Sequence, residues 1–331
     1  MDRVAGLTPS QRSELFQATA EAQGLVPAAV EKDFWVCWVL KKIYSNATLA
    51  DQLLFKGGTS LSKCFALIER FSEDVDLVLD WRLITDENPY DERSNRQQDM
   101  FNKRFELAAQ DYIVGALKQA LAAAFGDVGQ LVARDVGRKE LVFQYPSAFS
   151  SDYIRPEILI EVSPMSAMAP SRELVIQSYS AKHFPAQFSD TDISVRTIEA
   201  RKTFWDKITI LHAEAHRPTN KDLPTRYSRH YYDIYQMLNT WVKGDALADL
   251  ALLKDVAAFK NKFYPQGWAK YRDIIEGSVQ LLPQEHSNAR LSSDYKSMQE
   301  MIHGNYPEFS EVMAAIKEFE TELNDALIVE R

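Results

Sequence analysis

The stretch that decides the fold is Leu53-Leu-Phe-Lys56-Gly-Gly-Thr-Ser60, followed by Asp74-Val-Asp76-Leu-Val-Leu79. The apolar runs Leu53–Lys56 and Val75–Leu79 each predict a short strand. Between them, Gly57-Gly58 lets the backbone approach a ligand, and a helix starting at Thr59 or Ser60 would offer free N–H groups to a phosphate. A Gly-Gly turn before a helix is more often a plain connector, and the Walker pattern is absent.

The second strand carries two candidate metal ligands. Asp74 and Asp76 lie two residues apart, so their carboxylates point to one side of the strand. They repel unless a cation or proton lies between them, and Mg²⁺ is the common cation; a solvated strand end is the alternative. A third carboxylate would favour the metal site. Glu161 is the first candidate and Glu157 the second, because both lie on one face of a predicted strand at 154–162. Three carboxylates can hold two Mg²⁺ ions that activate a hydroxyl and stabilise a leaving pyrophosphate.

Around these strands the chain is mostly helical. The periodicity predicts further strands at 140–145 and 174–179, and helices at 9–24, from 27, after Gly58, at 98–125, 197–215, 227–243, 245–262, 266–276 and 306–327. The helix after Gly58 is expected to bury a stripe of Leu61, Cys64, Phe65 and Ile68. Regular βαβ units are too few for a doubly wound fold. We expect an α+β protein with N-terminal helices (1–45), a core with a small mixed sheet (46–195) and a C-terminal helical domain (196–331).

Composition is that of a folded protein with more than one domain. The chain has 331 residues, of which 46% are hydrophobic and 26% charged. The N-terminus lacks the regions of a signal peptide and no apolar run is long enough to span a bilayer, so we expect a cytoplasmic protein without membrane contact. The two cysteines, Cys37 and Cys64, are expected to be buried thiols.

Charge is unevenly distributed. The net charge is −9, but from Arg196 to Arg229 eight basic residues stand against four acidic ones, which gives this segment +4. Such a segment can be a nucleic-acid contact or an ordinary solvated helix face. Within it Lys207 reads by default as a surface lysine, and Asp233, just after it, as the partner of an arginine or of Lys207.

The order of these blocks resembles the AbiEii/AbiGii toxin family of nucleotidyltransferases. The resemblance rests on four runs, Glu31-Lys-Asp-Phe34, Lys56-Gly-Gly-Thr-Ser-Leu-Ser-Lys63 with Arg70-Phe-Ser-Glu-Asp-Val-Asp-Leu77, Thr203-Phe-Trp-Asp-Lys-Ile-Thr-Ile-Leu-His212, and Arg226 through Asp233 to Tyr235. It covers about residues 30–240. It implies a polymerase-beta-like nucleotidyltransferase core and membership of type IV toxin–antitoxin and abortive-infection systems. The relatives with known activity, the MenT group, add nucleotides to tRNA 3′ ends and so block translation.

The resemblance also implies roles for individual residues. The catalytic set would be Asp74, Asp76, Glu161, Lys207 and Asp233, with the first three binding two Mg²⁺ ions. The NTP would be held by Gly57, Gly58, Thr59, Ser60 and Lys63. The basic segment would contact tRNA, through Arg201, Lys202, Arg226 and Arg229, and a cognate antitoxin would be a further partner.

The sequence leaves two other functions open. The same core could transfer NMP to a Ser, Thr or Tyr hydroxyl of a protein, such as the antitoxin, and the net negative charge is compatible with a protein acceptor. A nucleotide-binding module that sequesters a partner without catalysis is the third possibility.

Overall fold

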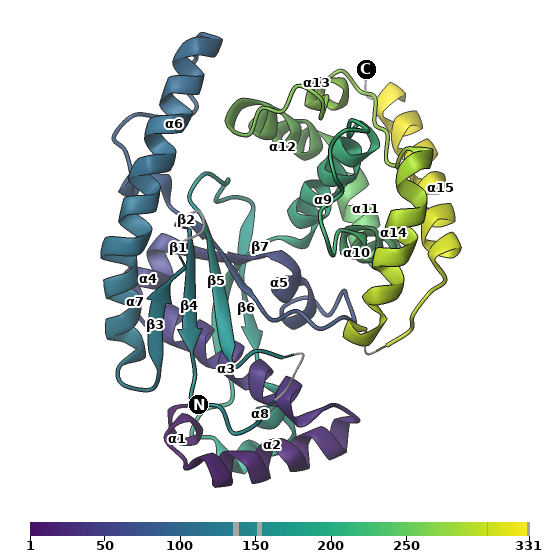
Figure 1. Ribbon diagram of the computed structural model, residues 1–331. Coiled ribbons are helices and arrows are strands. Elements are labelled where there is room, and N and C mark those ends of the chain that lie inside the picture. The colour runs from purple at the N-terminus through teal and green to yellow at the C-terminus, as the bar shows by residue number, and fades with distance from the viewer. Residues whose placement is uncertain (135–138, 151–153, 303, 330–331) are drawn as a thin grey trace. The chain divides into compact units, whose positions relative to one another are not determined.

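The computed structural model describes residues 1–134, 139–150, 154–302 and 304–329. The chain divides into two compact units. The sheet unit comprises Met1–Cys64 and Ser72–Ile198, and the helical unit comprises Phe65–Phe71 and Glu199–Arg331 (Figure 1). The short segment Phe65–Phe71 therefore packs with the C-terminal helices. The N-terminal helices group with the sheet, and the expected boundaries at residues 45 and 195 stay predictions.

Within the described residues the sheet unit contains one mixed sheet of seven strands, in the order β3-β4-β5-β2-β1-β7-β6. The strands are β1 (Leu53–Lys56), β2 (Val75–Leu79), β3 (Gln130–Ala133), β4 (Glu140–Gln144), β5 (Glu157–Ser163), β6 (Ser171–Ile176) and β7 (Ile193–Ile198). β2 is parallel to β5 and β1 is parallel to β7, whereas the other neighbouring pairs are antiparallel. The predicted α+β class with a mixed sheet is confirmed, although β3 and β7 were not among the predicted strands.

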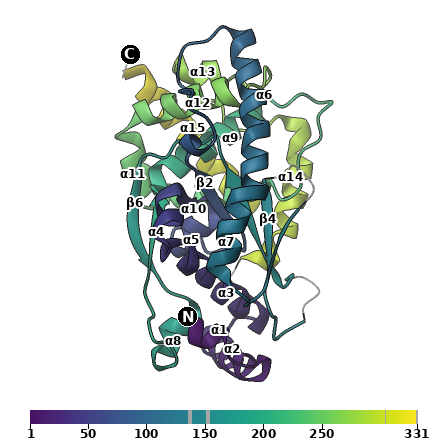
Figure 2. The ribbon, with the colours of Figure 1, turned by 90° about the vertical axis from the view of Figure 1, so that its left-hand side faces the viewer.

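The helices of the sheet unit include several that begin where the sequence predicted. They are α1 (Asp2–Ala5), α2 (Pro9–Gln23), α3 (Pro27–Tyr44), α4 (Ala47–Gln52), α5 (Gly57–Lys63), α6 (Asn95–Tyr112), α7 (Lys118–Phe125) and α8 (Tyr179–His183). Thr8 caps α2 in a capping box with Gln11. A π-helical turn, Ile113–Leu117, joins α6 to α7, so the predicted helix at 98–125 is one long rod with a changed hydrogen-bond pattern at its middle (Figure 2).

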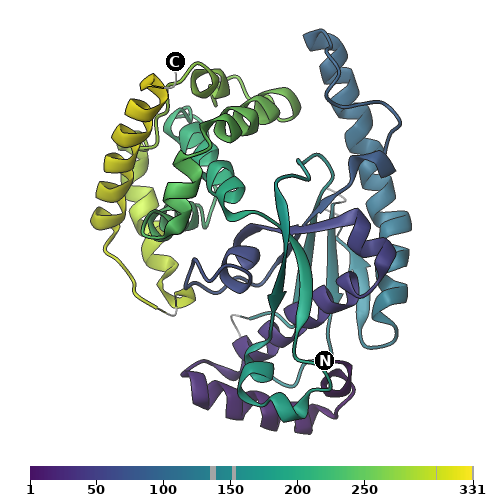
Figure 3. The same cartoon turned by 180° about the vertical axis from the view of Figure 1, so that it is seen from behind.

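One face of the sheet is covered by α3, which contacts β5 and β7 (Figure 3). Because side chains alternate along a strand, Ile158, Ile160 and Val162 of β5 enter the core on this face. Glu157 and Glu161 point to the opposite face and are half-buried. The carboxylates of β5 therefore lie on the side of the sheet that α3 does not cover.

The predicted apolar stripe after Gly58 is wrong. α5 ends at Lys63, and Cys64 is its C-cap residue. Ala66 then adopts a left-handed backbone with φ of 51°, through which a right-handed helix cannot continue. Phe65 and Ile68 belong to the helical unit, whereas Leu61 is buried in the sheet unit. The helical spacing was shared by two segments that fold into different units.

The helical unit, in its described part, contains α9 (Ala200–Ala215), α10 (Ser228–Leu238), α11 (Trp241–Leu247), α12 (Leu250–Phe263), α13 (Tyr271–Ile275), α14 (Glu285–Ser297) and α15 (Phe309–Val329). The predicted helix at 227–243 is two helices, because Thr240 caps α11 by accepting a hydrogen bond from the Val242 N–H. The predicted helix at 197–215 begins later, since residues 197 and 198 end β7. Helix α14 was not predicted. Among the residues that the structure describes, no helix has the length and apolar character needed to cross a membrane.

Candidate active site

One row of residues across the sheet carries three carboxylates on neighbouring strands. Glu140 of β4 lies opposite Glu161 of β5, and Glu161 lies opposite Asp76 of β2. On the other side Asp76 lies opposite Lys56 of β1. Directly opposed residues project to the same face of a sheet, so Glu161, expected as the third carboxylate, is the neighbour of Asp76. Asp74 precedes β2 and is close enough for its charge to act on Glu161. We call Asp74, Asp76 and Glu161 the carboxylate cluster.

The electrostatics of the carboxylate cluster favour a bound cation. The pKa of Glu161 is raised from 4.5 to about 7. Burial is the largest cause, followed by the charge of Asp76, a hydrogen bond with Asp76, and the charges of Asp74 and Glu140. A divalent cation would relieve this repulsion. A donor set made only of carboxylate oxygens suits Mg²⁺ better than a softer transition metal, so these residues fit the expected metal.

Gly57 brings the backbone against the carboxylate of Asp76. Its φ is 82°, in the left-handed region that favours glycine. A Cβ at this position would lie 2.7 Å from Cγ of Asp76 and would overlap its carboxylate oxygen. Any residue other than glycine would therefore have to displace the Asp76 side chain. The sequence predicted that Gly57 lets the backbone approach a bound ligand. In the structure the space left by its missing side chain is occupied by Asp76, a proposed metal ligand.

The hydroxyls of Thr59 and Ser60 are used inside the protein. Thr59 Oγ1 donates to the carbonyl oxygen of Asp74 at 2.5 Å and lies 2.9 Å from Ser72 Oγ. Ser60 Oγ donates to the carbonyl oxygen of Gly57 at 2.9 Å. Both residues are fully buried. The two hydroxyls tie the Gly-Gly turn and the start of β2 together, and their expected contact with the triphosphate stays a prediction.

Lys63, expected to bind nucleotide, is paired inside the sheet unit. Its Nζ lies 2.5 Å from Asp33 Oδ1 and 4.4 Å from the centre of the Tyr179 ring. The other oxygen of Asp33 accepts a hydrogen bond from the Tyr179 N–H at 2.7 Å. Burial alone would lower the pKa of Lys63, but the charge of Asp33 outweighs it together with Cys37 and Tyr179, and the net shift is upward. Lys63 links α5 to α3 and α8, so its role as a nucleotide ligand stays a prediction.

The neighbours of Asp33 on α3 are also buried and bonded. Glu31 accepts hydrogen bonds from Ser147 Oγ and from the Ala148 N–H, both at 2.7 Å. Lys32 Nζ lies 2.9 Å from Glu73, the residue before Asp74. The run Glu31-Lys32-Asp33 thus holds four separate segments against α3. Three consecutive charged residues before the apolar Phe34 were the available signal for this role, which sequence reasoning did not assign.

A second buried cluster lies in the helical unit around Asp233 of α10. Arg70 donates two hydrogen bonds to Asp233, from Nε to Oδ1 at 2.7 Å and from Nη2 to Oδ2 at 2.8 Å. Lys207 Nζ of α9 lies 2.8 Å from Oδ2 and 3.5 Å from Nδ1 of His230. Asp233 is 0% exposed. Lys207 is therefore not a surface lysine. The sequence predicted an arginine or Lys207 as the partner of Asp233, and the structure places both beside it.

Two neighbouring positive charges explain how the Asp233 carboxylate tolerates burial. Burial, the largest effect, would raise the pKa of Asp233, but Arg70 and Lys207 hold it well below its usual range. The pKa of Lys207 is lowered, mainly by burial and further by Arg70, while Asp233 opposes the shift. Burial, Lys207 and Arg229 lower the pKa of His230, which is neutral at pH 7. Two cations around one anion leave the cluster with a net positive charge.

The four residues expected to contact RNA fall into two groups. Arg201 lies 2.8 Å from Glu199 and 3.1 Å from Asp249, and the buried Lys202 lies 2.9 Å from Asp206. Arg226 and Arg229 are exposed. The backbone of Arg226 is left-handed, with φ of 58°, and its N–H donates to Asp294 at 2.7 Å. Composition could not separate the acid-paired cations from the exposed ones.

Known proteins place these residues in a family. The family model described as nucleotidyl transferase AbiEii toxin, type IV toxin–antitoxin system, matches residues 38–320. The chain belongs to this family. No curated protein matches the sequence. Among solved structures, MenT4, the nucleotidyltransferase toxin Rv2826c from Mycobacterium tuberculosis H37Rv, is similar with 16% sequence identity and a TM-score of 0.45, covering 98% of this chain and 100% of that chain.

Membership in the AbiEii family confirms the sequence-based recognition. The chain is a nucleotidyltransferase of a toxin–antitoxin family, which implies an NTP substrate and a cognate antitoxin. The matched range spans both the carboxylate cluster and the cluster around Asp233.

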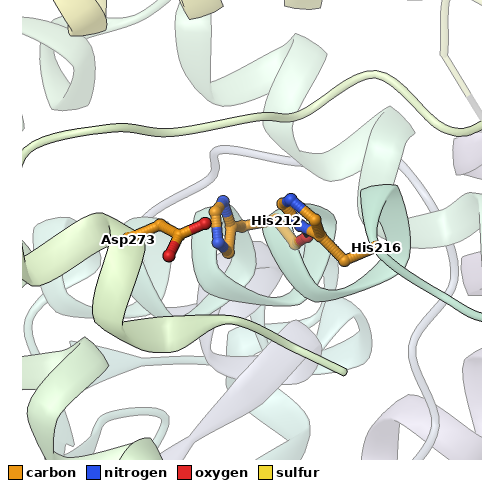
Figure 4. A group of neighbouring side chains, drawn as sticks. All are labelled: His212, His216 and Asp273. Carbon is orange, nitrogen blue, oxygen red and sulfur yellow. Dashed lines mark hydrogen bonds between the residues drawn. The ribbon is translucent and has the colours of Figure 1, made fainter. Parts of the chain in front are cut away.

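Among the described residues of the helical unit of this AbiEii chain, His212, His216 and Asp273 form a group of possible metal ligands (Figure 4). One ligand atom from each lies within 4.8 Å of the others. However, Nδ1 of His212 accepts a hydrogen bond from the Gln280 N–H, and Nε2 donates to the Lys270 carbonyl, both at 3.1 Å. A metal on either nitrogen would displace one of these bonds. Burial lowers the pKa of His212 to about 4, so the neutral ring is a structural link between α9 and the chain around α13.

Proposed function

We propose that the chain transfers NMP from an NTP to an RNA hydroxyl at the 3′ end of tRNA, and thereby blocks translation. The observation that carries the proposal is the pairing of Asp76 with Glu161 on adjacent strands, with Asp74 beside them. In the reaction the RNA hydroxyl oxygen bonds to the α-phosphorus and loses its proton. The bond from the α-phosphorus to the bridging oxygen breaks, and pyrophosphate leaves.

The carboxylate cluster would hold Mg²⁺, and its three carboxylates offer enough oxygen atoms to bind two ions. Bound there, Mg²⁺ would lower the barrier by activating the attacking hydroxyl and neutralising charge on the leaving pyrophosphate. Gly57 has no Cβ and so leaves the space that the Asp76 carboxylate occupies, and Thr59 fixes the carbonyl of Asp74. We assign the triphosphate to the backbone of the turn formed by Gly57, Gly58, Thr59 and Ser60, with Lys63 stiffening α5 through Asp33.

In the helical unit Lys207 would provide positive charge for a nucleotide phosphate. Its ammonium is buried beside Asp233 and Arg70, and a phosphate is a natural partner for a cluster with surplus positive charge. Exposed Arg226 and Arg229 would contact RNA phosphates. Arg201 and Lys202 would have to exchange their acidic partners first, so we rank them below the exposed pair.

A labelling experiment tests the proposal. The protein is incubated with each α-labelled NTP, Mg²⁺ and a cell lysate containing tRNA and protein, and the products are separated by class. Label in tRNA that is removed by 3′ exonuclease supports the proposal. Label in a protein band would replace it with NMP transfer to a protein hydroxyl. No label in either class from a folded preparation would contradict both.

Asp76→Ala separates catalysis from sequestration. A non-catalytic module that binds a partner would still arrest growth when this carboxylate is removed. Loss of growth arrest in a stably expressed Asp76→Ala protein would support the enzyme, and retained arrest would support sequestration. Co-expression with candidate antitoxins from the same operon tests the remaining partner. We place the reaction in the cytoplasm, where tRNA and NTPs are available.

A further inference from the structure

Arg70 lies in Phe65–Phe71, the segment that joins α5 to β2 but packs in the helical unit. Its guanidinium is buried and is fixed by the two hydrogen bonds to Asp233, at 2.7 and 2.8 Å. A bidentate pair of this kind restricts both the position and the plane of the guanidinium. Asp233 also keeps Lys207 as a partner. The segment is thus held by a helix that comes 163 residues later in the sequence.

The backbone beside Arg70 is held as well. The Phe71 N–H donates to the Met301 carbonyl at 2.6 Å, and Arg70 forms an isolated antiparallel bridge with Ile302. The Glu69 carboxylate accepts a hydrogen bond from the Asn305 N–H at 3.2 Å. Three consecutive residues of the segment are therefore fixed by their backbone or side chains.

Only Ser72 and Glu73 separate this segment from Asp74. Ser72 Oγ lies 2.9 Å from Thr59 Oγ1, and Glu73 lies 2.9 Å from Lys32 Nζ. The chain is thus held at residues 69–71 within the helical unit, and at residues 72 and 73 within the sheet unit, directly before Asp74. A shift of the segment would be passed through two peptide units to the first metal-binding carboxylate.

We infer that Arg70 is a positioning residue for the carboxylate cluster, and that Asp233 acts through it. By binding Asp233, Arg70 fixes the segment that leads into β2 and so sets where Asp74 and Asp76 lie. Asp233 needs no contact with substrate or metal for this role, in agreement with its complete burial between two cations. The inference rests on the proposed metal role of the two aspartates.

The test compares Arg70→Gln and Arg70→Lys with Arg290→Gln. Gln retains donors without the charge, and Lys retains the charge without the planar fork. Arg290 of the same unit pairs at 2.9 Å with the exposed Asp222. Its variant therefore removes an arginine–aspartate pair that includes neither Asp233 nor a residue of the 69–74 segment. Mn²⁺ binding is measured by electron paramagnetic resonance with a non-hydrolysable NTP analogue. Amide exchange is measured on peptides covering residues 72–79, and circular dichroism reports folding.

For Arg70→Gln we expect at least tenfold weaker Mn²⁺ binding and faster exchange over residues 72–79. Arg70→Lys should fall between this variant and the wild type, and Arg290→Gln should match the wild type. Asp233→Asn should resemble Arg70→Gln. The double variant should bind Mn²⁺ no more weakly than the single variant with the lower affinity, because both substitutions remove the same interaction.

A folded Arg70→Gln protein with Mn²⁺ affinity and amide exchange within twofold of the wild type would overturn the inference. If Arg70→Gln does not fold, Arg70→Lys decides by the same criterion. A wild-type protein that binds Mn²⁺ through Asp76 but transfers no NMP would refute the proposed function alone, since the effect of Arg70 on metal binding would still be measured.

Discussion

Replacing Gly57 with alanine should reduce activity about 100-fold in a protein that still folds. The left-handed backbone, with φ of 82°, costs a residue with a Cβ about 1–2 kcal/mol. The new Cβ would lie 2.7 Å from Cγ of Asp76, so that carboxylate must move by roughly 1 Å to reach an ordinary contact distance. Misplacement of a reacting group by this distance can reduce the rate about 100-fold. We therefore expect kcat/KM for NMP transfer to fall by about two orders of magnitude.

Gly24 supplies a matched control for this variant. It has a similar φ, 66°, but a Cβ there would meet no atom within 4 Å. Gly24→Ala should thus show the same loss of about 1–2 kcal/mol in urea unfolding and normal activity. The assay is initial-rate NMP transfer at saturating Mg²⁺, alongside urea unfolding of both variants. A folded Gly57→Ala protein with kcat/KM within threefold of Gly24→Ala would refute the packing of Gly57 against a working Asp76.

Three further outcomes are expected. Glu161→Gln should abolish metal-dependent transfer yet stabilise the metal-free protein at pH 8 by about 1–2 kcal/mol after discounting for solvent screening. The reason is that the raised pKa of Glu161 makes the wild-type protein lose stability as pH rises from about 4.5 to about 7. A variant that is less stable than the wild type in urea unfolding with EDTA would contradict this. The pH dependence that His212 causes runs in the opposite direction, because its pKa of about 4 means that stability falls as pH drops from about 6.5 to about 4. His212→Asn should remove up to about 3 kcal/mol of that fall, measured by unfolding at each pH. An unchanged pH profile of stability would count against this role of His212. Arg226→Ala with Arg229→Ala should reduce the slope of log affinity for tRNA against log salt by about 1.5, measured by filter binding, and an identical slope would exclude these side chains as phosphate contacts.

The part of the sheet that carries the candidate site could be predicted from local sequence. The Gly-Gly turn, the two-residue spacing of Asp74 and Asp76, and the alternation that exposes Glu161 are local patterns with a direct geometric consequence. The register that places Glu161 opposite Asp76 could not be read from sequence, because nothing local specifies which strands become neighbours. β7 was missed because its alternation, Ile193 to Ile198, is short and runs directly into the pattern of α9.

The sequence predicted an arginine or Lys207 as the partner of Asp233, but it could not identify which arginine. Arg70 and Asp233 are 163 residues apart, and neither position shows that both are buried. The spacing of apolar residues after Gly58 indicated one helix, whereas a left-handed Ala66 separates two segments. Composition identified the basic segment, but it could not show which of its cations are paired with acids that lie far away in the sequence, such as Arg201 with Asp249.

The most direct test of the central claim is Mg²⁺-dependent transfer of α-labelled NMP by wild-type and Asp76→Asn proteins in parallel. Asn keeps the size of the side chain and removes the charge that would hold the metal. We expect label in RNA from the wild-type protein with Mg²⁺, none with EDTA, and at least a 100-fold loss in a folded Asp76→Asn protein. Transfer by Asp76→Asn at the wild-type rate would contradict the assignment of the carboxylate cluster as the metal-binding active site.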